Sequence, residues 1–317
     1  MQEIRSPFRA RFGAALHALT LLCLVCLGSC VTVEKDIPRP GDDEYKPLGP
    51  ATRTNHSIGK YLADLNTSIA AWNAKSLTAS SSVEIRKHDL LEVNIRERVK
   101  NRFDEILQQL ETGPTRNRQI AAGAVGFAGD PRALSPLLAA LKDPDERVVG
   151  NALVSIGLLA IKETPLHEVG NVLRNSTNSR TRWSAANAAL ELIAAGADPD
   201  GIIEPARFAL TDVEEPAVRS QAALVLALVG DVESLDALGE LIFDEVPLVS
   251  TAAAAAVSKL GRTDSHSTGK AARLLFAALE QGDRKLKLRV HPALVQLAGR
   301  NYDLNMDAWR EWIDLLD

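Results

Sequence analysis

The side chains that most often carry out chemistry in proteins are few and scattered in this chain. No two histidines stand four residues apart, so the helical histidine pair of the zinc peptidases is absent from the sequence. Asp264, Ser265 and His266 are the residue types of a hydrolase, but neighbours in one turn cannot form a triad, which needs side chains from separate elements. The sequence also lacks a phosphate-binding loop and a Gly-x-Gly-x-x-Gly stretch. It therefore predicts no catalytic residue, no metal ligand, no cofactor and no enzyme. The histidines are His17, His56, His88, His167, His266 and His291.

The three cysteines lie close together near the N-terminus, at Cys23, Cys26 and Cys30. The Cys-x-x-Cys spacing of the first two could form a redox or metal pair, but both lie inside the apolar run 18–27. That run follows a basic stretch and is about half of the roughly 20 residues that a membrane-spanning helix needs. Two small residues then come directly before Cys30. This order predicts an export signal, and the first two cysteines are discarded with it.

The tetrapeptide Leu27-Gly28-Ser29-Cys30 resembles the lipobox of bacterial lipoproteins, although that family more often has Ala or Ser at position 28 and Gly or Ala at position 29. The resemblance implies a signal peptide over residues 1–29 and lipidation of Cys30, and two or more acyl chains hold a protein stably on a membrane. It places the protein in the bacterial cell envelope. Val31 stands where an aspartate would favour the inner membrane, so the outer membrane, facing the periplasm, is the expected location. A secretory signal cut elsewhere and a permanent transmembrane anchor are the alternatives.

Composition favours a helical and mildly acidic mature chain. The 317 residues are 46% hydrophobic but only 4% aromatic, so alanine and leucine must build most of the core. Residues 1–29 hold three Arg and one Glu, and their removal leaves 33 basic and 40 acidic residues, a net charge near −7. Such a chain without a basic stripe is a poor nucleic-acid binder. Residues 30–57 contain four prolines and are expected to form an extended tether.

Two amphipathic helices are predicted between residues 58 and 112. Apolar residues spaced three and four apart run from Ile58 to Trp72, and residues 76–82 interrupt the pattern. A second stripe predicts one helix over residues 83–110, and Gly113-Pro114 follow it. We expect an N-terminal helical hairpin over residues 58–112 that covers the start of the next segment. A coiled-coil dimer is the weaker alternative, because fewer than four clean heptads are present.

From residue 115 onward the chain repeats itself. The pattern Arg-x-x-Ala-Ala occurs at 118–122, 182–186 and 219–223, and looser copies begin at 148, 249 and 288. A small residue at the centre of each copy recurs at steps of 31, 33, 37, 31 and 39 residues. A period of this size is typical of stacked helical hairpins, so about six units are predicted over residues 115–300. The central residues are Ala121, Ala152, Ala185, Ala222, Ala253 and Pro292.

Each unit joins an Ala-rich first helix to a Leu-rich second helix through a glycine and an aspartate. Gly129-Asp130 and Gly230-Asp231 show this best. Glycine tolerates the left-handed conformation that closes a helix, and the aspartate is expected to cap the next one. Gly123, Gly126 and Gly129 are predicted to be small packing positions in a helix and its cap.

At these residues the chain resembles HEAT repeats, in particular the short bacterial type also found in phycobiliprotein lyase subunits. The fourth copy, 216–231, fits best, whereas the second has Val149 in place of the arginine. The resemblance implies an all-α fold, an α-solenoid of HEAT-like hairpins preceded by the N-terminal hairpin. It says little about function, because this fold serves many unrelated binding tasks.

The last residues, 301–317, resemble the closing segment of bacterial HEAT-repeat proteins. Trp309 and Trp312 are three residues apart and share a helix face. We expect a C-terminal capping helix that covers the open end of the stack, with a peptide-binding aromatic pair as the alternative.

These features together predict a non-enzymatic, lipid-anchored scaffold or adaptor that binds a protein or peptide partner. The concave surface is expected to be formed by the second helices, with six exposed positions as candidate contacts. A structural assembly subunit that makes contacts through its ends is the alternative, and a lyase-like or ligand-binding protein is a further one. The sequence leaves the oligomeric state open. The candidate contacts are Arg132, Ser135, Arg207, Asp236, Glu240 and Arg273.

Overall fold

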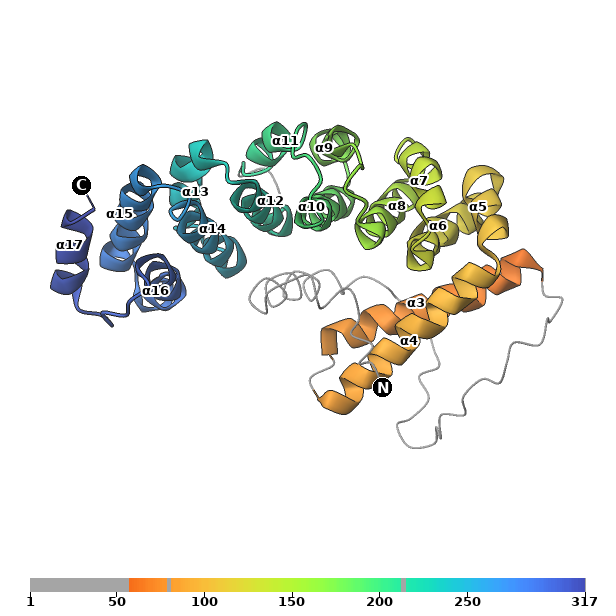
Figure 1. Cartoon of the computed structure of the whole chain (residues 1–317), viewed down its shortest axis with the longest axis horizontal. Coiled ribbons are helices and arrows are strands. Elements are labelled where there is room, and N and C mark those ends of the chain that lie inside the picture. The colour runs from red at the N-terminus through yellow and green to blue at the C-terminus, as the bar shows by residue number, and fades with distance from the viewer. Residues whose placement is uncertain (1–56, 79–80, 212–214, 317) are drawn as a thin grey trace.

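The computed structural model describes residues 57–78, 81–211 and 215–316, and every regular element in these ranges is a helix (Figure 1). Cys30 and nearly all of the expected tether lie outside them. No helix in the described ranges is both long and apolar enough to cross a membrane. The α-solenoid predicted from the repeat is confirmed.

The repeats form two parallel rows of helices that curve into an arc (Figure 1). One row consists of α6 (Thr115–Ala124), α8 (Glu146–Leu159), α10 (Ser179–Ala194), α12 (Pro216–Val229), α14 (Pro247–Leu260) and α16 (Arg284–Ala298). The other consists of α5 (Phe103–Thr112), α7 (Leu134–Ala140), α9 (Leu166–Asn175), α11 (Ile203–Phe208), α13 (Leu235–Leu241), α15 (Ser265–Gln281) and α17 (Met306–Asp314). Figure 1 shows the first row on the concave side and the second row on the convex side. We call them the inner and the outer row.

Alanine brings the inner helices close together. The central residues Ala121, Ala152, Ala185, Ala222 and Ala253 are all 0% exposed, and each inner helix packs closely on the next one. Neighbouring outer helices pack less closely: α9 contacts α11 and α5 contacts α7, but α7 and α9 make few or no contacts with each other. The last copy departs from the predicted register, because Pro292 is exposed while Ala293 is buried.

The predicted helix ends are confirmed at most turns. Gly129 closes the 3₁₀ turn η1 (Val125–Ala128) that continues α6, with φ of 65°, and Gly230 closes α12 with φ of 79°. A three-residue 3₁₀ turn follows each glycine, η2 (Pro131–Ala133) and η3 (Val232–Ser234). The Asp130 carboxylate accepts a 2.9 Å hydrogen bond from the amide of Arg132. Asp231 does not cap in this way, since its carboxylate accepts from the Arg207 guanidinium instead.

The N-terminal hairpin is shorter than predicted. It consists of α3 (Ile58–Thr78) and α4 (Ser82–Asn101), and the backbone breaks at Arg102 with φ of −132° and ψ of 32°. The prediction of one helix over 83–110 was wrong, because α5 turns away to bury Phe103 and Ile106 against the repeats. The hairpin itself lies on the concave side and packs on α6 and on the 3₁₀ turn η1 (Val125–Ala128) (Figure 1).

The C-terminal helix α17 packs on α15 and covers the last unit. Trp309 is 0% exposed, and its indole N–H donates a 2.9 Å hydrogen bond to the carbonyl of Asp303. Trp312 is half-buried, with its ring centroid 5.9 Å from that of Trp309. The burial of Trp309 favours the capping interpretation of this aromatic pair.

Candidate functional site

All six contact positions predicted from the sequence lie on the outer row or in the turns that lead into it. The expectation that second helices line the concave face was wrong, because those helices form the convex side of the arc (Figure 1). The apolar spacing of a helix shows which of its faces is buried but not on which side of a curved stack the helix lies.

Three of these positions, Arg132, Asp236 and Arg207, connect neighbouring parts of the outer surface. Arg132 pairs with Asp130 at 2.8 Å and with Asp104 of α5 at 3.1 Å. Its hydrogen bonds hold the pKa of the Asp130 carboxyl below the usual value. Asp236 of α13 pairs with Lys270 of α15 at 2.8 Å.

Arg207 of α11 is the most heavily engaged of the six. Its Nε donates a 2.8 Å hydrogen bond to Asp231, and its Nη2 lies 2.7 Å from Glu233. The hydrogen bonds to Asp231 are the main reason why the pKa of Arg207 is raised. Ser135, Glu240 and Arg273 are exposed on the same surface.

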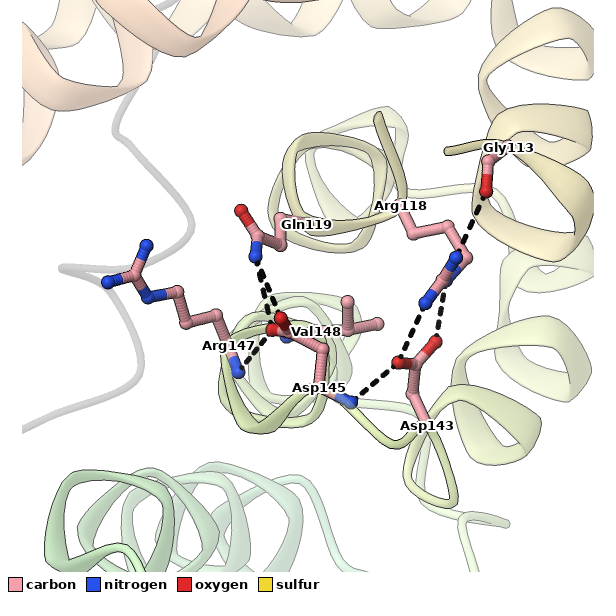
Figure 2. A network of polar contacts seen from close by, with 7 residues as sticks. All are labelled: Gly113, Arg118, Gln119, Asp143, Asp145, Arg147 and Val148. Carbon is pink, nitrogen blue, oxygen red and sulfur yellow. Dashed lines mark hydrogen bonds and ion pairs between the residues drawn. The ribbon is translucent and has the colours of Figure 1, made fainter. Parts of the chain in front are cut away.

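Arginines of the inner row hold the repeats together near the helix N-termini (Figure 2). Arg118 donates from Nε to Asp143 at 2.8 Å and from Nη1 to the carbonyl of Gly113 at 3.1 Å. Burial alone would raise the pKa of Asp143, but the hydrogen bonds from Arg118 and from the amide of Asp145 lower it. Arg219 repeats this contact at Asp244, where both side chains are only 9% exposed. The same arginine-to-aspartate contact at two places in the chain indicates a structural role.

The concave face presents the sides of inner helices that no neighbouring helix covers. Helix α8 packs on α6, α10 and α7, so its remaining stripe, which includes Arg147, Asn151 and Val154, faces the inside of the arc. Figure 2 shows the Arg147 guanidinium directed away from the Asp143 network, and within the described chain it makes no ion pair. Asn187 and Glu191 continue this surface on α10.

A cleft opens where the N-terminal hairpin meets this surface. The hairpin contributes Trp72, Glu92 and Arg96, and the inner row contributes the end of α8 and Glu191 of α10. This cleft was not predicted from the sequence. One signal was available in the sequence, because Glu92 lies three residues before Ile95 and seven before Val99, on the face of α4 that is buried. The other residues that line the cleft come from η1 and its cap and from the ends of α8 and α10: Gly126, Phe127, Gly129, Gly157, Leu158, Leu159, Ala160 and Glu191.

One stack of helical hairpins, whose helices form two rows and which repeats an arginine-to-aspartate contact at Arg118 and Arg219, defines an α-solenoid repeat protein. The family model described as HEAT repeats matches residues 103–194 and 203–298, and the chain belongs to this family. The match begins at Phe103, the first residue of α5, which agrees with the helix break at Arg102.

Solved structures with a similar fold include designed and natural repeat proteins. The designed armadillo repeat protein YIII(Dq)4CqI is 20% identical over 61% of this chain and 98% of its own, with a TM-score of 0.47. The designed armadillo repeat protein YIII(Dq.V1)4CPAF, solved in complex with the peptide (KR)4, is 19% identical over 61% and 98%, with a TM-score of 0.48. The complex of CpcE and CpcF of phycocyanin lyase from Nostoc sp. PCC7120 is 18% identical over 67% and 93%, with a TM-score of 0.42. No curated protein matches the chain.

Proposed function

We propose that this protein is a non-enzymatic HEAT-repeat scaffold that binds a protein partner on its concave face. The observation that carries the proposal is the inner row itself, a continuous curved surface to which α8 and α10 contribute uncovered polar and apolar side chains. Solenoids use such extended concave surfaces for binding. The outer row is a weaker candidate, because Arg132, Arg207 and Asp236 are engaged within it.

The concave face carries groups for recognition rather than for catalysis. Arg147 offers an exposed cation and Val154 is 39% exposed, whereas the amides of Asn151 and Asn187 are hydrogen-bonded to Gln119 and Gln221 of the neighbouring helices. In the described ranges no three His, Cys, Asp or Glu side chains come together in a group that could hold a metal ion. Mixed polar and apolar surface of this kind suits a peptide or protein.

We further propose that Cys30 is lipidated and that the scaffold works at the periplasmic face of the outer membrane. The support is the order of basic stretch, apolar run, small residues and cysteine at the N-terminus. Intact mass of the native protein should give a chain that starts at Cys30 and carries acyl groups. In Cys30→Ser the acyl mass and the membrane association should both disappear, and retention of either would refute the anchor.

Site-specific photo-crosslinking in intact cells tests the binding face. A photoreactive residue at position 154 or 187 of the inner row should crosslink one protein, whereas position 135 or 240 of the outer row should not. The four positions are all at least partly exposed, so accessibility alone does not separate them. Crosslinks found only at 135 and 240 would move the interface to the convex side, and crosslinks at none of the four would overturn the proposal.

A further inference from the structure

The last inner helix, α16, carries a cluster of positive charge in a chain that is otherwise acidic. Residues 259–300 hold nine basic and three acidic residues, whereas residues 191–245 hold two basic and thirteen acidic ones. Four of the nine cations stand within six consecutive positions of α16. We call these four the basic cluster: Arg284, Lys285, Lys287 and Arg289.

The basic cluster has no compensating charge within the described residues, where none of its four members forms an ion pair. Nε of Arg289 donates a 3.3 Å hydrogen bond to the hydroxyl of Ser250, which is neutral. The nearest carboxylates along the chain are engaged elsewhere. Asp283 accepts a 2.7 Å hydrogen bond from an amide of the first turn of α16, and Glu280 pairs with Arg310 at 2.9 Å.

The stability of α16 does not explain these cations. Arg284, Lys285 and Lys287 lie in its first turn, where the helix dipole disfavours positive charge. Lys285 and Arg289 are four residues apart, and like charges at this spacing repel each other. Local choices that oppose the fold in this way are expected at functional positions.

An exposed apolar side chain lies in the middle of the basic cluster. Leu288 is 67% exposed, and Arg284 and Pro292 stand four residues before and after it on the same side of the helix. Cations around an exposed leucine complement a segment that carries both carboxylates and an apolar side chain.

This side of α16 faces the inside of the arc. The opposite side packs on α14 and α15. Leu288 stands five residues before the buried Ala293, the same distance that separates Arg147 from the buried Ala152 in α8. Figure 1 shows α16 in the inner row, on the concave side. A flat lipid bilayer cannot enter a concave surface, so a polypeptide suits this position better.

We propose that the basic cluster and Leu288 bind an acidic segment of the partner protein. The carboxylates of the segment pair with the cations, and one of its apolar side chains packs on Leu288 and Pro292. The basic cluster spans about 7.5 Å along the helix axis, which matches two or three residues of an extended chain. The inference rests on the proposed function for the existence of a protein partner, and it adds the chemistry by which that partner is recognised.

Fluorescence anisotropy of labelled peptides tests the chemistry. The protein is titrated into the blocked hexapeptide Glu-Leu-Glu-Glu-Leu-Glu and into the same peptide with every glutamate replaced by glutamine. The acidic peptide should bind and the glutamine peptide should not. Binding should weaken as sodium chloride is added, because salt screens exposed charge pairs.

Variants then locate the bound peptide. The double variant Arg284→Gln with Lys285→Gln should weaken binding about five- to tenfold, because it removes two exposed charge pairs. Leu288→Asn should weaken it about threefold or more through lost apolar contact. The matched control Arg116→Gln with Arg147→Gln removes two exposed arginines near the N-termini of other inner helices and should leave binding unchanged. Circular dichroism of all variants should match the parent, since every changed side chain is exposed.

Three results would overturn the inference. The first is equal binding of the acidic and glutamine peptides, or binding of neither. The second is an equal loss in the control pair and in the Arg284 and Lys285 pair. The third is co-sedimentation of the protein with phosphatidylglycerol vesicles that the Arg284 and Lys285 changes abolish, which would assign the basic cluster to a lipid surface. Crosslinking at positions 154 and 187 tests other helices, so failure here is distinguishable from failure of the proposed function.

Discussion

Three glycines at the end of the first inner helix should respond differently to replacement by alanine. At Gly123 an added Cβ would lie 3.5 Å from Cγ of Asn151, which is an ordinary contact. Alanine is favoured over glycine inside a helix by about 0.8–1.0 kcal/mol. Gly123→Ala should therefore raise the free energy of unfolding by up to about 1 kcal/mol.

Gly126 has no such room. A Cβ there would lie 2.6 Å from Cα and 2.7 Å from the carbonyl oxygen of Ser155, so η1 and α8 would have to separate. Overpacking of this kind costs about 1–3 kcal/mol. The separation would also stretch the 3.1 Å hydrogen bond from the amide of Gly126 to Ser155, which is 0% exposed, and loss of a buried partner costs about 1–3 kcal/mol. We expect Gly126→Ala to lower the free energy of unfolding by about 2–5 kcal/mol.

Gly129 should give an intermediate loss. Nothing lies within 4 Å of a Cβ placed there, but its φ of 65° is left-handed, which costs an L-residue about 1–2 kcal/mol. Urea denaturation followed by circular dichroism measures the three changes. Hydrogen exchange in α6 and α8 localises them, since repeat proteins can unfold in parts. If Gly126→Ala were as harmless as Gly123→Ala, the close approach of η1 to α8 would be refuted.

Three further outcomes are expected. Asp244→Ala should cost about 1–3 kcal/mol, because it removes the carboxylate that accepts a hydrogen bond from the buried guanidinium of Arg219; no loss of stability in urea denaturation would contradict this. Trp309→Ala should cost about 3–5 kcal/mol and speed hydrogen exchange in α15, whereas Trp312→Ala, at a half-buried position, should cost clearly less; equal losses would argue against the capping role. The lowered pKa of Asp143 means that its stabilisation is complete above the unfolded pKa near 4 and is lost as the pH falls through the folded value. Denaturation midpoints measured from pH 5 down to pH 2 should therefore fall less steeply in Asp143→Asn than in the parent protein, and identical slopes would contradict the assignment.

The sequence was sufficient to predict the stacked hairpins, but not where the N-terminal hairpin ends. Buried alanines at a regular period predicted the stacked hairpins, because only small residues allow inner helices to approach so closely. The break at Arg102 was not predictable from spacing, since Val99, Phe103, Ile106 and Leu110 continue the apolar stripe across it. What separates α4 from α5 is tertiary packing on different partners.

The candidate site was missed for two physical reasons. The second helices were expected on the concave side, although the alanines themselves carried the relevant signal: the row with the smaller side chains has the shorter spacing and must lie inside the curve. The cleft depends on the hairpin folding back onto α6 and η1, which no local pattern encodes. Asp231 shows the same limit of local sequence patterns. Gly230-Asp231 repeats the Gly129-Asp130 dipeptide, yet the Asp231 carboxylate binds Arg207, which lies 24 positions earlier in the chain.

The difference in side-chain size between the two rows has a mechanical consequence. Methyl groups separate adjacent inner helices, while the outer helices spread apart, so the radius of the arc depends on a few ångströms of alanine packing. Larger side chains at these positions would push the inner helices apart, which would straighten the arc and widen the opening of its concave face. Variation in the inner alanines could thus fit the same framework to partners of different width, with the outer surface left as it is.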